Sequence, residues 1–356
     1  MLTDVAAEER ARDADGALSV STAVETDRPS WDAFVSTCAG ATGYHEWAWR
    51  TVFEQTFGHR SVYLMARRGT RIEGVLPLVQ INSLLFGRTM TSLPFVNYGG
   101  VLASSAGAAQ ALLSAAAGEA RAGRCRHVEL RHVDRQFPDL PCKQHKVTMR
   151  LALEAGLWEH IDRKVRNQVR KAEKSQLTVE RGGAELVADF YTVFARNMRD
   201  LGTPVYARRL FENVLRAFPD RARLIVVRLH GQPIAAGLTY RTGTTVEVPW
   251  ASSVRDFNNL CPNHLLYWHA IETAIADGCT TFDFGRSTPG EGTFKFKEQW
   301  GAVPVPLHWE YRLLHEGGLP DQSPKNPKFQ MMIGMWQRCP LWLANALGPH
   351  IVRSIP

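Results

Sequence analysis

The stretch TTFDFGRSTPGEGTFKFKEQWG, residues 280–301, decides the fold of this chain. Its first part, Thr280–Phe284, is rich in β-branched and aromatic residues in alternation, which predicts a strand. A Gly/Pro/Ser turn follows, and then a dense segment, Phe294–Trp300, that carries Lys295 and Lys297. If this segment is extended, both lysines point to the same face. A lysine beside a polar strand end would suit the binding of an anionic or carbonyl substrate. The alternative interpretation of this segment is a surface hairpin whose lysines are solvated.

The elements around this strand repeat an order that already occurs in the first half of the chain. The first half predicts helices near 31–38 and 46–57, strands at 62–67 and 72–79, a helix at 108–122 and a strand at 125–131. The second half predicts helices at 184–200 and 208–217, strands at 224–229 and 234–240, a helix at 264–276 and a strand at 280–284. A period of domain size predicts two α+β domains with mixed, mostly antiparallel sheets.

The repeat also predicts how the chain is divided. We expect a disordered tail at 1–17, an N-terminal domain at 18–155, a C-terminal domain at 156–320 and an apolar tail at 321–356. Prolines prevent the last segment from forming one continuous helix. It either packs on the second domain or lies on a membrane surface with Trp336 and Trp342 as interfacial anchors.

Composition narrows the class of protein. The 356 residues are 45% hydrophobic and 22% charged, with a net charge of +7, which is typical of a globular protein that favours anionic partners. Six scattered cysteines form no C-x-x-C pair, so neither a metal site nor a disulfide framework is expected. The N-terminus lacks a signal-peptide pattern, and no apolar run approaches the roughly 20 residues of a spanning helix. We therefore expect a cytoplasmic protein.

The run FDFGRS followed by GTFKFKEQWGA resembles the C-terminal signature of the FemAB-like acyltransferases. These are GNAT-related proteins, many of which transfer an aminoacyl group from tRNA to a peptidoglycan precursor. Further matching pieces are GVLPLV, SLPFVNYGG, NMRDLGTP, VPWAS and PNHLLY. The branch associated with exosortase/PEP-CTERM exopolysaccharide systems is the most similar. The resemblance implies two tandem GNAT-like domains with the site in or near the cleft between them.

The resemblance also implies catalytic residues. Lys297 matches the lysine of the family's F-K motif, and acyl transfer to an amine needs a cation or N–H donor beside the developing oxyanion. Lys295 is the competing lysine. Asp283 and Arg286, at the end of the predicted strand, would orient the lysine or the acceptor amine. For these two residues, a purely structural contact within the strand end is the alternative.

Further residues are predicted to bind substrate. Arg199 aligns with a family arginine that contacts the phosphates of a nucleotide-sugar acceptor. The tyrosine that those enzymes place four residues on is Thr203 here, with Tyr206 nearby, which fits a branch with another acceptor. Trp250 and Asn263 lie in the matching VPWAS and PNHLLY segments. Core packing is the alternative for Trp250, and Asn263 is expected to be the N-cap of the helix that follows it.

A basic segment, Arg163–Lys174, predicts an amphipathic helix that bridges the two halves. It carries six positive residues and one negative, a net +5, and its apolar residues recur at i, i+4 and i+7. A solvated surface is one interpretation. The other is an anion platform, with Arg166 and Arg170 among its cations, for tRNA phosphates, a lipid pyrophosphate or anionic lipid.

Together these features predict an N-acyl or aminoacyl transferase that acts on an amine of a cell-envelope or exopolysaccharide precursor. No cofactor is expected beyond an anionic acyl donor, either aminoacyl-tRNA or acyl-CoA, and the acceptor is a glycan, nucleotide-sugar or lipid-linked molecule. The chain lacks the R/Q-x-x-G-x-G/A turn that binds the pyrophosphate of acetyl-CoA. Two alternatives stay open: an acyl-CoA-dependent N-acyltransferase, and a non-catalytic module that binds anionic glycans. Peripheral contact with the inner membrane face is expected if the acceptor is lipid-linked.

Overall fold

The computed structural model describes residues 16–83, 87–315, 318–319 and 327–355. The chain divides into two compact units. Unit 1 is formed by residues up to 144, 307–319 and the last three residues, and unit 2 by residues 145–306 and 320–353. Most of the predicted disordered tail, residues 1–15, lies outside the described residues.

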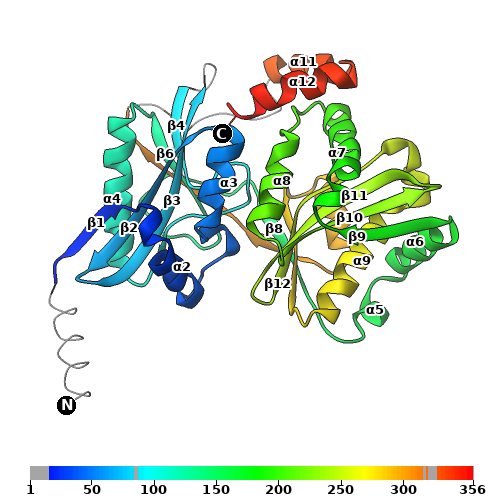
Figure 1. Cartoon of the computed structure of the whole chain (residues 1–356), viewed down its shortest axis with the longest axis horizontal. Helices are drawn as coiled ribbons and strands as arrows, with labels where there is room; N and C mark the ends of the chain where they lie inside the picture. The colour runs from blue at the N-terminus through cyan, green and yellow to red at the C-terminus, as the bar shows by residue number, and fades with distance from the viewer. Residues whose placement is uncertain (1–15, 84–86, 316–317, 320–326, 356) are drawn as a thin grey trace. The chain divides into compact units, whose positions relative to one another are not determined.

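Unit 1 is built on one mixed sheet with helices on both faces (Figure 1). Its strands are β1 (Leu18–Thr22), β2 (Arg60–Arg68), β3 (Arg71–Ser83), β4 (Gly87–Thr91), β5 (Leu102–Ala103), β6 (His127–His132), β7 (Cys142–Lys143) and β15 (His308–Leu313). Their order is β1-β2-β3-β4-β6-β15-β7, with β5 beside β3. Among the described strands of this sheet, only β4 and β6 are parallel neighbours. The helices are α2 (Arg28–Thr37), α3 (Ala48–Phe57) and α4 (Ala106–Ala122), with 3-10 turns at Glu25–Asp27 and Gly43–His45. Side chains alternate across a strand, so Leu64 of β2 joins the core under α4 while Tyr63 stacks on Trp31 of α2.

Unit 2 repeats this plan in the order β14-β8-β13-β12-β11-β10-β9. Its strands are β8 (Val147–Ala152), β9 (Leu177–Gly182), β10 (Ala222–Leu229), β11 (Gln232–Thr242), β12 (Thr245–Ser253), β13 (Thr281–Ser287) and β14 (Val303–Pro306). Its helices are α5 (Leu157–His160), α6 (Arg163–Lys174), α7 (Val187–Leu201), α8 (Arg208–Ala217), α9 (Pro262–Ala276), α10 (Gly292–Glu298), α11 (Pro327–Gln337) and α12 (Leu341–Val352), with 3-10 turns at Ala184–Leu186 and Arg255–Leu260. In Figure 1, α7 and α8 cover one face of the sheet, and α6 and α9 cover the other.

The predicted fold class is confirmed. The series β2-β3-β4-α4-β6 of unit 1 corresponds to β10-β11-β12-α9-β13 of unit 2, and both sheets are mostly antiparallel with one parallel neighbour pair. Each helix in these series crosses from one parallel strand to the next, as a parallel pair requires.

The units are not divided where the linear repeat predicts. β8, placed in the first domain by the sequence, pairs with β13 of unit 2, whereas β15, placed in the second, pairs with β6 of unit 1. Each sheet thus takes one strand from beyond the boundary at 155/156. Pairing over long sequence distance is invisible to a repeat pattern, which explains the difference.

Two further expectations concern unit 2. The basic helix α6 has the predicted bounds, but it does not bridge two halves: it follows β8 and packs against α9 inside unit 2. The described part of the predicted apolar tail forms α11 and α12, which pack against α7. Among the described residues, no helix combines the length and the apolar character needed to span a membrane.

Candidate active site

The parallel pair of unit 2 opens into a fork. The ladder between β12 and β13 continues only as far as Glu247 and Asp283 among the described residues. Beyond this point β12 stays paired with β11, while β13 stays paired with β8. We call residues 248–253 of β12 and 284–287 of β13 the fork. Sheets with parallel strands commonly bind ligands beyond the carboxyl ends of neighbouring strands that diverge.

A bulge shapes the β13 side of the fork. Asp283 lies opposite Arg150 of β8, and Arg286 lies opposite Thr148, so β13 uses one residue more than its partner. Gly285 lies inside the bulge with a φ of 72°, a conformation that favours glycine. The fully buried carboxylate of Asp283 accepts hydrogen bonds from the Gly285 amide at 2.8 Å, the Thr148 hydroxyl and Arg150 Nε at 3.2 Å. The carboxylate therefore fastens the bulge to β8.

Lys297 reaches the same bulge from α10. Its ammonium Nζ donates to the carbonyl oxygens of Gly285 at 2.9 Å and Arg286 at 3.0 Å. The side chain is buried, and this burial lowers the pKa of Lys297 to about 8, while the nearby carboxylates of Asp283 and Glu247 oppose the shift. The site therefore holds a desolvated ammonium beside two buried acids, which suits it to carry charge in a reaction.

Lys295 lies on another face of the same element. The segment is the helix α10 and not an extended strand, so the expectation that both lysines share one face is wrong. Residues two apart on a helix point in nearly opposite directions, and Lys295 is exposed whereas Lys297 is buried. The alternation of Phe and Lys imitates a strand here because Phe294 and Phe296 both pack partly against the core.

Amide and hydroxyl side chains border the end of β12. Asn263 Nδ2 donates to Ser253 Oγ at 2.9 Å, and Asn197 Nδ2 of α7 donates to Ser252 Oγ at 3.0 Å. The prediction that Asn263 is the N-cap is wrong, because α9 begins at the preceding proline and its N-cap is Cys261. The Asn263 side chain is thereby released from capping and ties the first turn of α9 to the fork.

Unit 1 has the corresponding parallel pair, but its own backbone fills the space beyond it. The Ser92 amide donates to the Glu129 carbonyl at 2.9 Å, and the amide of Arg131 donates to Ser92 Oγ at 2.8 Å. The Gly99 amide donates to the Arg131 carbonyl at 3.1 Å. A buried ion pair between Arg131 and Glu129, 2.7 Å apart, lies in the same region. We therefore assign the candidate site to unit 2.

Arg199 makes contacts of a structural kind at the end of α7. Its Nε donates to Asp200 Oδ1 at 2.7 Å, and its Nη1 donates to the carbonyl of Cys339 at 3.3 Å. The guanidinium thus links α7 to the connection between α11 and α12. Its predicted role in binding an acceptor phosphate stays a prediction.

Tyr206 and Trp250 pack against α7 and α8, the helices that cover one face of the unit 2 sheet. The Tyr206 ring stacks on Phe194 at 6.4 Å, and its carbonyl accepts a hydrogen bond from the Tyr191 hydroxyl. Trp250 is buried, with its ring edge against Phe211 at 5.5 Å. These contacts support the core-packing interpretation of Trp250, and the substrate role of both residues stays a prediction.

The basic face of α6 is present as predicted. Its three apolar residues are buried, and its cations lie on the other side. Arg166 Nη1 is 3.2 Å from the Glu159 carboxylate, and the guanidinium of Arg170 lies 5.7 Å from the Trp158 ring centroid. Both side chains are held by α5, so they are partly ordered before any anion arrives.

Sequence reasoning missed several residues around the bulge. Glu247 is a buried acid between two valines of β12, a signal similar to the one that singled out Asp283, and could have been found. Thr148 and Arg150 lie on β8, a strand the sequence pattern did not reveal. Lys146 donates from Nζ to the Thr288 hydroxyl at 2.6 Å, and burial lowers its pKa.

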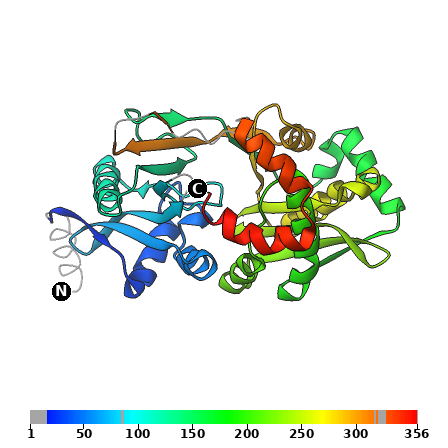
Figure 2. The ribbon, with the colours of Figure 1, turned by 90° about the horizontal axis from the view of Figure 1, so that it is seen from above.

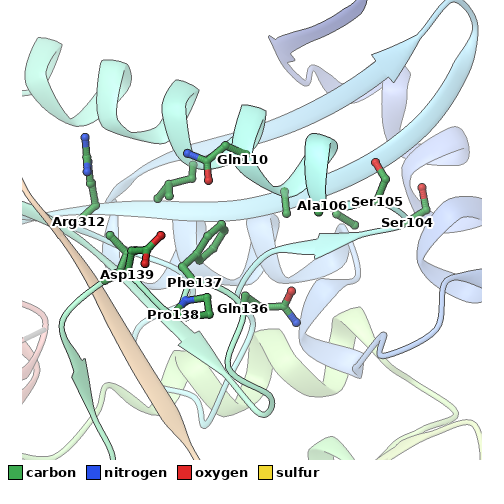
Figure 3. A pocket seen from close by; sticks show the side chains of 13 residues that line it. Ser104, Ser105, Ala106, Gln110, Gln136, Phe137, Pro138, Asp139 and Arg312 are labelled. Carbon is green, nitrogen blue, oxygen red and sulfur yellow. The ribbon is translucent and has the colours of Figure 1, made fainter.

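A cavity of about 520 Å³ lies elsewhere, in unit 1 at the start of α4 (Figure 3). Its polar lining includes Ser104, Ser105, Gln110, Gln136 and Arg312. None of the predicted site residues lines it. Within the described ranges, no group of three or more His, Cys, Asp or Glu side chains could hold a metal ion.

Part of unit 2 is similar to a known family of domains. Residues 160–298 match the family model described as Acetyltransferase (GNAT) domain. The matched range runs from just before α6 to the last residue of α10, so it contains both sides of the fork. No curated protein sequence matches the chain.

Solved structures show the same fold over nearly the whole chain. The crystal structure of FemX has a TM-score of 0.64 at 16% identity, over 88% of this chain and 100% of that one. A tandem GNAT protein from the clavulanic acid biosynthesis pathway has a TM-score of 0.56 at 11% identity, over 85% and 100%. The structure of L-PGS from Bacillus licheniformis has a TM-score of 0.53 at 12% identity, over 88% and 98%. The chain therefore has the tandem GNAT fold.

Proposed function

We propose that this chain is a FemAB-like N-acyl or aminoacyl transferase whose acceptor is an amine on a cell-envelope or exopolysaccharide precursor. The observation that carries the proposal is the buried Lys297 ammonium at the bulge of β13, in the fork of a GNAT-type domain. In the reaction the acceptor nitrogen attacks the carbonyl carbon of the donor. The C–N bond forms, the C–O or C–S bond to the carrier breaks, and the proton lost from the amine leaves with the carrier oxygen or sulfur.

Lys297 is the group that would stabilise the transition state. An ammonium has three N–H donors, and two of them hold the carbonyl oxygens of Gly285 and Arg286. We assign the third to the oxyanion that develops on the donor carbonyl, where one such donor is worth about 10²–10³ in rate. Lys297 remains mostly protonated at neutral pH, since its pKa is about 8.

Asp283 is a positioning residue in this proposal. Its carboxylate accepts hydrogen bonds from donors that hold the bulge, namely Thr148, Arg150 and the Gly285 amide. It thereby orients the two carbonyl groups that grip Lys297. Arg286, on the same face as Asp283, would attract an anionic part of a substrate.

Aminoacyl-tRNA is the donor that we favour. The connection that precedes α9 is a 3-10 helix without glycine, Arg255–Leu260, so it does not offer the flexible amides of a pyrophosphate loop. The basic face of α6 lies in the same unit and suits a polyanion. The acceptor class is proposed from the resemblance to the FemAB-like family, and we propose that the reaction takes place in the cytoplasm.

The decisive experiment compares donors and then follows the product. Thermal shift of the whole chain with aminoacyl-tRNA, acyl-CoAs and nucleotide-sugars identifies which classes bind, because stabilisation follows occupancy. Mass spectrometry of an amine acceptor incubated with the binding donor then detects the acylated product. We expect transfer with the wild-type protein and a rate lower by about 10²–10³ with Lys297→Met. Stabilisation by glycans alone, without transfer from any donor, would instead favour a binding module.

A further inference from the structure

The helices α11 and α12 present one side to unit 2 and the other to solvent. They form a bent pair (Figure 2), with Pro340 at the junction. On α11, Ile333 lies against Gly202, which follows α7. On α12 the buried positions are spaced by four: Ala344, Gly348 and Val352. Gly348 approaches the backbone so closely that an added Cβ would lie 2.8 Å from the nitrogen of Val205. This packing fixes which side of the pair faces outward.

The outward side is strongly apolar. Trp342 is 71% exposed and Met331 is 68% exposed. We call the apolar face the set of exposed residues on α11, α12 and the end of α7: Leu201, Met331, Met332, Met335, Trp342, Leu347 and Ile351. Elsewhere in the described part of the chain, the exposed large hydrophobic residues are Val24 and Val303 alone. A concentration of this kind marks an interaction surface, whereas scattered exposed residues do not.

The charges around the apolar face identify its partner. Residues 330–355 contain Arg338 and Arg353 and no Asp or Glu, and Asp200, which precedes Leu201 on α7, is paired with Arg199 at 2.7 Å. In a symmetric dimer, a second copy of this face would bring like charges together, which opposes self-association. An anionic lipid surface, in contrast, complements both the cations and the apolar side chains. Tryptophan and flexible methionine side chains suit a fluid interface of this kind.

We propose that the apolar face docks unit 2 on the surface of an anionic lipid bilayer. Trp342 and the methionines of α11 enter the boundary between headgroups and acyl chains, and Arg338 contacts lipid phosphates. The insertion is shallow, because α11 and α12 are short and held to α7 by their other side. This inference stands on the apolar face alone and does not depend on the proposed transfer reaction.

Flotation of the full chain with lipid vesicles tests the proposal. The vesicles consist of phosphatidylcholine alone, or of phosphatidylcholine mixed with phosphatidylglycerol. The test variant Met331→Gln/Met335→Gln/Trp342→Gln removes exposed apolar groups only, so we expect it to keep the wild-type melting temperature. Its partition coefficient on mixed vesicles should fall at least about tenfold. The matched control, Val24→Gln/Val303→Gln, changes exposed apolar residues outside the face and should bind like the wild type.

A charge variant gives an independent result. Arg338→Glu should weaken binding to the phosphatidylglycerol vesicles and leave the weaker binding to phosphatidylcholine unchanged. Equal flotation of the wild type and the triple variant would overturn the proposal. A second result would also overturn it: the wild type does not float but sediments as a dimer, and the triple variant sediments as a monomer. The face would then bind a second copy of the chain. Transfer activity of each protein with water-soluble substrates is measured separately, so that failure here is distinct from failure of the proposed function.

Discussion

Asp283 and Arg286 lie three positions apart on β13 and still share one face of the unit 2 sheet. Their partners on β8, Arg150 and Thr148, are only two residues apart and therefore point to the same side. In a regular strand, positions three apart would face opposite sides. The extra residue in the bulge thus brings the guanidinium to the carboxylate face. The same bulge presents the carbonyl oxygens that bind Lys297.

Replacing the bulge glycine should affect both stability and activity. Gly285→Ala forces a left-handed conformation (φ 72°) on an L-residue, and we expect a loss of about 1–2 kcal/mol in the free energy of unfolding. Transfer activity should fall as well, since Lys297 loses its carbonyl partners. Gly290→Ala is the matched control, because Gly290 has a φ of 80° and open space where an added Cβ would lie. It should cost similar stability in urea unfolding but keep full activity, and an equal loss of activity would contradict the role of the bulge.

Lys297 and Lys295 should behave differently on substitution. Lys297→Met keeps most of the side-chain volume and should lower the transfer rate by about 10²–10³, the usual effect of one oxyanion donor. Lys295→Met removes an exposed charge on the other side of α10 and should change the rate by less than about threefold. Circular dichroism establishes that both variants are folded. Wild-type activity in Lys297→Met would remove this lysine from the mechanism.

The lowered pKa of Lys297 predicts a particular pH dependence of stability. The folded pKa of about 8 lies below the ordinary value of 10.5, so between these values the unfolded chain binds the proton and the folded one does not. The free energy of unfolding should therefore rise with pH in this window. Relative to Lys297→Met, the wild type should gain about 2 kcal/mol between pH 8 and pH 10. Urea unfolding of both proteins at each pH measures the difference, and parallel curves would mean that the lysine titrates normally.

Substitution of Arg199 distinguishes a structural role from a role in binding an acceptor phosphate. Because it links α7 to the carbonyl of Cys339, Arg199→Ala should lower the free energy of unfolding by about 1–2 kcal/mol. The KM for the acceptor should stay unchanged. Arg196→Ala on the same helix removes an exposed ion pair with Asp256 and should cost less than about 1 kcal/mol. An increase in KM at unchanged stability would support the phosphate role implied by the family resemblance.

The basic face of α6 should make donor binding sensitive to salt. Reversing two of its exposed cations, Lys164→Glu/Lys171→Glu, should weaken tRNA binding at least about tenfold and flatten the slope of log affinity against log salt concentration by about two. The control Arg71→Glu/Arg121→Glu makes the same change in net charge in unit 1. Filter binding at several salt concentrations provides both quantities. Identical slopes for the two double variants would mean that the basic face of α6 does not bind tRNA and is only a solvated surface.

Local pattern predicted the repeated series of elements in each half, but it did not reveal β8 or which strands are neighbours in a sheet. The bounds of α6 and the series of strands and helices in both halves follow from periodicity within short windows. The helix α10 escaped the same reasoning, because its alternating Phe and Lys residues look like a strand until the turn at Glu291 starts a helix. The N-cap of α9 was misplaced by two residues for a related reason, since a proline at the first helical position moved the start of the helix.

Much of the candidate site followed from the sequence, and the geometry of its residues did not. Asp283 is identifiable along the chain, because a charged residue in an apolar setting requires a partner, whereas Lys297 was identified through the resemblance to the F-K motif of the family. The partners of Asp283 are distant in sequence: Thr148 and Arg150 lie on β8, more than 130 positions away. Strand pairing across the chain decided which lysine is buried, which residues face Asp283 and which parallel pair opens into a fork. Residue types are a local property of the sequence, whereas pairing is decided by burial of the whole sheet, and only the tertiary structure contains that information.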